Sequence, residues 1–192
     1  AVLRERATDE LVELVANQAA GSPLFAEELA RLSASGRDTS MAPTIEAAIQ
    51  VSLDSIEESQ RDTLFRLSAF GLAGWERGFV AMGVADASIK LRRLSAAELV
   101  VERAESRFVG EREWTFKHAL VRDVVYASLS SELRKELHEQ AARFLENVGE
   151  DAATVAKHFD LGGDSRRAAG HWERASRRAL ATNSLVEAVS MA

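Results

Sequence analysis

Apolar residues recur at intervals of three and four along most of the chain, which is the spacing of an amphipathic helix. Alanine and leucine are abundant, and both favour helix. The pattern therefore predicts a mainly α-helical chain. The expected helices cover residues 8–19, 23–32, 43–53, 57–70, 75–82, 86–97, 118–126, 131–145, 152–161, 165–181 and 185–192.

The period of the pattern changes in one place. Residues 99–103 and 112–117 alternate in the manner of strands, and a polar turn that contains Gly110 separates them. Trp114 and Phe116 then share one face of the second strand. Helices followed by a two-stranded hairpin and a further helix make a winged helix, which we assign to residues 43–131.

The helix expected at 86–97 lies where a winged helix presents its recognition helix to DNA. Its polar face carries Lys90, Arg92 and Arg93, so a DNA-binding transcriptional regulator is the main alternative function. The turn between the strands carries Glu105 and Glu111, however, and further acidic residues surround the cations. We therefore favour a solvated face. The apolar residues of this helix are Ile89, Leu91 and Leu94.

Residues 132–192 repeat a simpler helical pattern. A stripe of leucine, alanine and phenylalanine between 133 and 145 predicts one long amphipathic helix, and small residues recur in the helices that follow. Helix pairs of this length with small residues at the contacts are typical of a helical-repeat array. We expect the start of an array of antiparallel pairs that resembles tetratricopeptide repeats, and a purely structural repeat scaffold is a second alternative.

Composition and charge restrict the kinds of site and partner that we expect. The 192 residues include no cysteine, which excludes disulfides and thiolate metal sites and fits a cytoplasmic protein. No apolar run approaches the roughly 20 residues of a membrane span. The net charge is −6, and residues 1–60 hold four basic against eleven acidic residues, so we expect no general electrostatic binding of nucleic acid. The chain begins at Ala1 and ends within a helical pattern, so we expect a fragment of a longer protein.

Three segments resemble one family. Gly-Ser-Pro-Leu-Phe at 21–25, followed by Glu-Glu-Leu at 27–29, resembles the Gly-x-Pro motif in the helical lid of STAND-type (AAA/NB-ARC-like) signalling ATPases. Residues 116–124 are similar to the segment of their winged helix that contains Met-His-Asp. Residues 155–159 and the alanine-rich helices after them resemble the tetratricopeptide-like array that follows. The order of the motifs is similar to that in bacterial regulators fused to a nucleotide cyclase, a Ser/Thr kinase or a DNA-binding output domain.

The resemblance implies a helical lid at 1–42, a winged helix at 43–131 and helical repeats at 132–192. It also implies that Pro23 packs near the adenine of bound ADP and that His118 contacts the terminal phosphate. Together these contacts would hold a closed, inactive form that opens when ATP replaces ADP. The aspartate that follows the histidine in plant and animal members is Ala119 here.

The chain contains no Gly-x-x-x-x-Gly-Lys-Ser/Thr loop, so we expect neither ATP hydrolysis nor bound nucleotide in this segment alone. ADP or ATP would be held in the full-length protein with an upstream P-loop ATPase core of the same chain. That parent would be an ATPase with a fused cyclase or kinase domain. The function expected for this segment is regulatory signal transduction, which relays the nucleotide state, together with a protein or small-molecule signal bound by the repeats, to the output domain.

Simpler interpretations of the same residues remain open. The residues 21–23 also form an ordinary junction where one helix stops and the next starts, and His118 could be only a capping or packing residue. The four histidines are not spaced as metal ligands, so we expect no metal site. We interpret Glu27 and Glu28 as solvated charges near a helix start, and we expect no catalytic residues.

Overall fold

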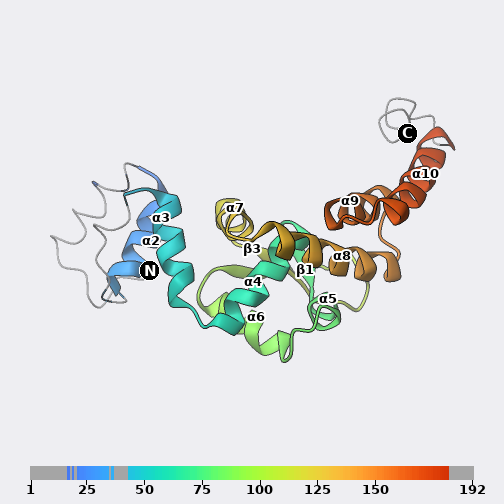
Figure 1. The fold of residues 1–192 in the computed structure, drawn as a ribbon. Coiled ribbons are helices and arrows are strands. Elements are labelled where there is room, and N and C mark those ends of the chain that lie inside the picture. The colour runs from blue at the N-terminus through green and yellow to red at the C-terminus, as the bar shows by residue number, and fades with distance from the viewer. Residues whose placement is uncertain (1–16, 18, 20, 35, 37–42, 182–192) are drawn as a thin grey trace.

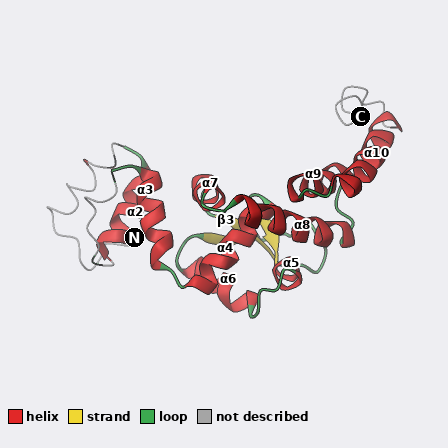
Figure 2. Cartoon of the chain, in the orientation of Figure 1, coloured by secondary structure: helices red, strands yellow, loops and turns green. Residues whose placement is uncertain are grey.

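The computed structural model describes residues 17, 19, 21–34, 36 and 43–181. It is mainly helical with one small sheet, as the pattern predicted (Figures 1 and 2). The α2–α3 hairpin lies at one end, the sheet in the middle, and α9 and α10 at the other end (Figure 1). The elements are α2 (Pro23–Ala34), α3 (Ile45–Ser55), α4 (Glu58–Phe70), β1 (Ala73–Trp75), α5 (Glu76–Ala81), α6 (Ala87–Ala96), β2 (Val100–Glu102), β3 (Glu113–Phe116), α7 (Ala119–Ala127), α8 (Ser131–Asn147), α9 (Ala152–Gly162) and α10 (Ser165–Ala181).

The elements α4, β1, α5, α6, β2 and β3 follow one another in the order of a winged helix. The predicted hairpin of β2 and β3 is present, with Val100 opposite Phe116. The sheet has three antiparallel strands in the order β1-β3-β2, so the two-stranded prediction missed β1. We call the connection between β2 and β3, residues 103–112, the wing.

The helix that we predicted from Trp75 to Met82 was wrong at its first residue. Trp75 ends β1, which pairs with β3, and the helix begins only at Glu76. The strand runs close beneath α4: a Cβ built on Gly74 would lie 2.9 Å from the ring of Phe70. Glycine therefore permits this approach, and the pairing with β3 overrides the local helical pattern.

The largest hydrophobic cluster fills the winged helix between α3, α4, α6, α7 and the sheet. Trp114 lies at its centre and is only 1% exposed. Leu91 and Leu94 of α6 are buried in it as expected, but Ile89 is 48% exposed. Ile89 belongs to the outer face of α6, because the helix turns only one stripe towards the core.

The helices α2 and α3 form a hairpin with a small core of its own, made from Phe25, Leu29, Leu32 and Ala48 together with Ala19. The caps follow the sequence. The hydroxyl of Ser22 accepts a hydrogen bond from the Phe25 N–H at 3.3 Å, and Thr44 caps α3 through the Ala47 N–H at 3.2 Å.

Helix α3 belongs to two cores. Its Ala48 packs in the hairpin, while Ile49 and Leu53, which are nearly inaccessible, pack in the winged helix. Because α3 contributes side chains to both clusters, a movement of α2 that displaces α3 would also displace side chains in the core of the winged helix.

The helices α8, α9 and α10, which we call the repeats, are joined by short connections, and α9 packs against both α8 and α10 (Figure 1). Ser130 and Asp151 cap α8 and α9. A Cβ on Gly162 would lie 3.0 Å from the backbone nitrogen of Glu139, so glycine lets α9 approach α8 closely. Gly163, with φ of 86°, ends α9 in the left-handed region.

Most of the helix predicted at 8–19 and the whole helix predicted at 185–192 lie outside the described residues. Within the described part of the chain, no helix is both long enough and apolar enough to cross a membrane.

Candidate functional site

The two residues that the resemblance singled out, Pro23 and His118, both lie at helix N-termini. Pro23 is the exposed first residue of α2. His118 is extended (φ −133°, ψ 134°) and immediately precedes α7, and its side chain makes no cap hydrogen bond. Its Nε2 atom is buried and has no hydrogen-bond partner within the described chain. A buried nitrogen in this state is available to a further polar group.

Glu27 connects the two helices. It lies one helical turn after Pro23 and reaches the junction of β3 and α7. There its Oε2 atom is 3.2 Å from Nζ of Lys117 and 3.6 Å from Nε2 of His118. The hydrogen bond from Lys117, reinforced by its positive charge, holds the pKa of Glu27 below its ordinary value. The structure thus brings the helix of Pro23 up to His118.

We call Glu27, Arg31, Glu98, Lys117 and His118 the His118 cluster. Arg31 and Lys117 each lie 3.5 Å from the carboxylate of Glu98. Within the cluster two carboxylates face the two cations, and Arg31 also pairs with Glu28 outside it. The imidazole of His118 adds a fifth polar group. This arrangement joins α2 to the ends of α6 and β3 entirely through charges.

The interpretation of Glu27 and Glu28 as solvated charges was wrong for Glu28, whereas Glu27 remains half-exposed. Glu28 is 2% exposed and accepts a hydrogen bond of 2.7 Å from the Ser52 hydroxyl of α3, while Arg31 lies 3.4 Å from its other oxygen. Pro23 starts α2 four residues earlier than Glu27, so both glutamates lie in the second turn. The face of α2 that carries Glu28 packs against α3, which buries that carboxylate.

Glu98 occupies a strained backbone position. Its φ is 58°, in the left-handed region that glycine favours at the end of a helix. An ordinary residue there costs about 1–2 kcal/mol. The side chain of Glu98 is the group that holds Arg31 and Lys117, so the strain accompanies a specific contact.

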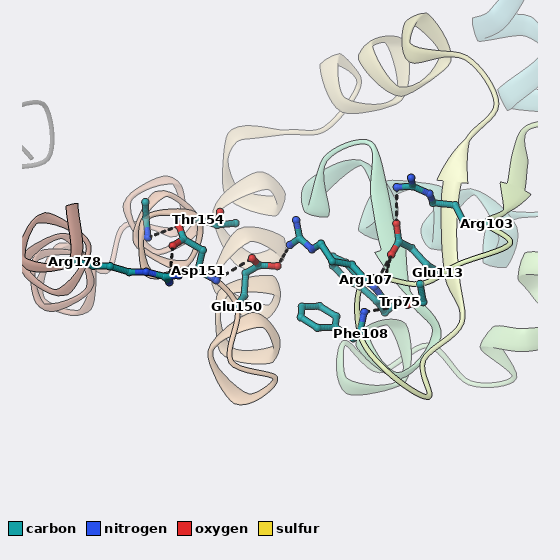
Figure 3. A network of polar contacts seen from close by, with 11 residues as sticks. Trp75, Arg103, Arg107, Phe108, Glu113, Glu150, Asp151, Thr154 and Arg178 are labelled. Atoms are coloured by element: carbon teal, nitrogen blue, oxygen red, sulfur yellow. Dashed lines mark hydrogen bonds and ion pairs between the residues drawn. The ribbon is translucent and has the colours of Figure 1, made fainter. Parts of the chain in front are cut away.

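A second polar network lies at the opposite end of the winged helix, where the wing meets the repeats (Figure 3). Its centre is Glu113 of β3, which is 2% exposed. The carboxylate accepts hydrogen bonds from Nε1 of Trp75 at 3.1 Å, from Arg103 at 2.9 Å and from the backbone N–H of Arg107 at 2.8 Å. Three donors on one buried carboxylate fix the path of the wing.

Arg107 carries this network across to the repeats. Its guanidinium lies over the rings of Trp75 and Phe108, at 5.5 and 5.6 Å from their centres, and pairs with Glu150 in the α8–α9 connection (Figure 3). Glu150 in turn accepts from the N–H of Asp151 at 2.9 Å. We call Trp75, Arg103, Arg107, Glu113 and Glu150 the wing junction.

The wing junction borders a cavity of about 200 Å³ between the sheet, the wing and the start of α9. Aromatic, aliphatic and charged groups line it, and both arginines on its wall already have carboxylate partners. The contacts suit a fixed joint between the wing and the repeats. The lining residues are Phe70, Ala73, Trp75, Arg103, Arg107, Glu113, Leu145, Glu150 and Thr154.

The sequence did not reveal a buried histidine pair between α8 and α9, which Tyr126 of α7 contacts. The Nδ1 atoms of His138 and His158 are 3.0 Å apart, and Nε2 of His138 is 2.8 Å from the hydroxyl of Tyr126. Burial, with nearby positive charges, lowers the pKa of each imidazole from 6.5 to about 4. Both rings are therefore neutral at pH 7, and one of them donates to the other.

The histidine pair has no third metal-ligating side chain beside it, and no group of three or more such side chains occurs among the described residues. Comparisons with protein-family models, with curated proteins and with solved structures found no match. The His118 cluster and the wing junction are accordingly the features from which a function can be argued.

Proposed function

We propose that this chain is the regulatory segment of a STAND-type signalling ATPase, in which α2 and the winged helix sense ADP or ATP and the repeats carry the signal onward. The observation that carries the proposal is the position of Glu27. Its carboxylate joins the helix of Pro23 to Lys117 and His118, so a lid helix and a winged-helix histidine lie side by side.

An anionic group would fit the His118 cluster in the place that the carboxylate of Glu27 occupies. Nε2 of His118 is buried without a hydrogen bond, and Lys117 supplies a positive charge beside it. Glu27 provides the negative partner in this structure. A terminal phosphate would be held by His118 and Lys117, and Pro23 would pack near the base. The phosphates of bound nucleotide would supply this negative charge, so the contacts of His118 and Lys117 would differ between the nucleotide-bound and the nucleotide-free protein.

The wing junction supports a relay towards the repeats. Arg107 pairs with Glu150, Glu150 accepts from the N–H of Asp151, and Asp151 lies 3.6 Å from Arg178 of α10 (Figure 3). A continuous series of contacts therefore links the wing of the winged helix to α10 of the repeats. A protein or small-molecule signal bound by the repeats would act through the same contacts on a fused cyclase, kinase or transcription domain.

The wing also favours this function over DNA binding. Arg103, Arg107 and Arg112 all pair with carboxylates of the same chain, on Glu113, Glu150 and Glu102. A wing that binds DNA needs its cations free for phosphates. Salt-dependent binding of duplex DNA by the 192-residue chain would favour the DNA-binding alternative.

The decisive experiment uses the full-length parent protein. We expect it to purify with tightly held ADP, and we expect His118→Ala to release that ADP. His171→Ala is the matched control, because His171 lies in α10 and contacts Glu146 of α8. Chromatography of the nucleotide released by denaturation measures the ADP retained. Equal retention by wild type and His118→Ala would contradict the sensor role of His118.

A further inference from the structure

An open depression of about 440 Å³ lies between α10 and Glu146 near the end of α8. It shares no lining residue with the His118 cluster or the wing junction. Three arginines contribute to its wall against one carboxylate. The lining residues are Glu146, Arg166, Arg167, Gly170, His171 and Arg174.

The charge of α10 differs from that of the chain as a whole. The helix holds five arginines and one glutamate, a net charge of +4, whereas the whole chain has a net charge of −6. The positive charge of the depression is only partly offset. Arg166 makes no ion pair or hydrogen bond with another described residue. Arg167, in contrast, lies 3.5 Å from Asp164, and Arg174 lies 2.6 Å from Nδ1 of His171 and 3.8 Å from Glu146.

Gly170 gives the depression its space. It lies inside α10, where glycine is unfavourable, yet a Cβ built there would have no neighbour within 4 Å. Arg166, Gly170 and Arg174 follow one another at four-residue spacing, so they share one stripe of the helix. The two arginines lie about 12 Å apart along the axis with an unobstructed surface between them.

We propose that this arginine-lined depression on α10 binds an acidic segment of a partner protein. Carboxylates match guanidinium groups in charge and geometry, and an extended peptide spans the distance between Arg166 and Arg174 with about four residues. The carboxylates of Glu146, Asp164 and Glu173 pair with arginines of α10. A nucleic acid carries a phosphate on every nucleotide, so some of its phosphates would be repelled by these carboxylates. A peptide can place neutral side chains beside the carboxylates.

This inference deepens the proposed function by naming the chemistry of the partner that the repeats bind. Its test involves no nucleotide, so the two proposals can fail separately. The probe is a fluorescein-labelled peptide of alternating glutamate and alanine, with the glutamine version as a matched control. Fluorescence anisotropy measures its binding to the 192-residue chain at low and at physiological salt.

We expect the acidic peptide to bind, the glutamine peptide not to bind, and affinity to fall as salt rises. The double variant Arg166→Ala/Arg174→Ala should weaken binding about fivefold, since each exposed ion pair contributes modestly. Arg143→Ala on α8 is the control: it removes one charge outside the depression and should change the affinity less than the double variant does.

A second variant separates the depression from a general effect of charge. Gly170→Leu leaves the net charge unchanged and favours helix, so the fold is retained. It should nevertheless weaken peptide binding, because its side chain fills the open surface between the arginines. Wild-type affinity in Gly170→Leu, equal binding by the arginine variants, or tighter binding of a single-stranded oligonucleotide than of the acidic peptide would each overturn the proposal.

Discussion

Acidification should destabilise this protein through the buried pair of His138 and His158. Both rings are neutral in the folded state because burial lowers the pKa of each from 6.5 to about 4. In the unfolded chain they take up protons at about pH 6.5. The stability that depends on the neutral pair is therefore complete above about pH 6.5 and is lost as the pH falls from there towards 4.

The size of the effect follows from the two pKa values. At about pH 5 an unfolded histidine is almost fully protonated while a folded one is still neutral, which favours unfolding by about 2 kcal/mol for one ring. The pair contributes at most about twice that amount. Its total is smaller than the sum of two independent rings, since the charge on His138 is itself one cause of the low pKa of His158.

The variant His158→Asn isolates this contribution. An asparagine amide can occupy the place of Nδ1 and accept or donate to His138, but it does not titrate. Urea unfolding followed by tryptophan fluorescence at about pH 7.5 and pH 5 gives the loss of stability for each protein. We expect the wild type to lose about 2 kcal/mol more than the variant. Equal losses, or four histidine NMR resonances that all titrate near 6.5, would refute the reasoning.

Three further predictions concern stability and are measured by thermal unfolding. Arg107→Ala should lower the free energy of unfolding by about 1 kcal/mol, because the nearly buried carboxylate of Glu150 then has no cationic partner. Arg107→Lys should recover part of this loss. Gly162→Ala should cost about 1–3 kcal/mol through overpacking, whereas Gly170→Ala should gain up to about 1 kcal/mol. Glu98→Gly should be about 1 kcal/mol more stable than Glu98→Ala, since both lose the ion pairs but only glycine relieves the left-handed strain. Opposite signs would contradict each prediction.

Local signals were sufficient for most of the helix boundaries. The predicted helix at 165–181 coincides with α10, and that at 57–70 differs from α4 by one residue. Ser22, with Pro23 after it, starts α2 as the sequence indicated. Caps and turn residues act within a few positions of the chain, so they can be recognised without knowing what packs above them.

The errors share a different cause. Trp75 became a strand residue because β3, which lies about forty positions later, offers it a pairing partner. Glu28 is buried because α3 covers it, and His138 meets His158 because α8 and α9 fold back on each other. Each outcome depends on a long-range contact that has no local pattern. For the same reason the link from Glu27 to His118, on which the proposed function depends, was not predicted from the sequence.

The position of α3 determines how a change at the His118 cluster would spread. Helix α2 meets α7 through half-exposed ion pairs of Glu27, each worth at most about 1 kcal/mol. In contrast, Ile49 and Leu53 fix α3 in the core of the winged helix, and burying each such side chain is worth about 1.5–3 kcal/mol. A ligand that displaced Glu27 would therefore move α2 without detaching α3. Because Ala48 on the same helix packs in the α2 core, that movement would press on the winged helix through α3.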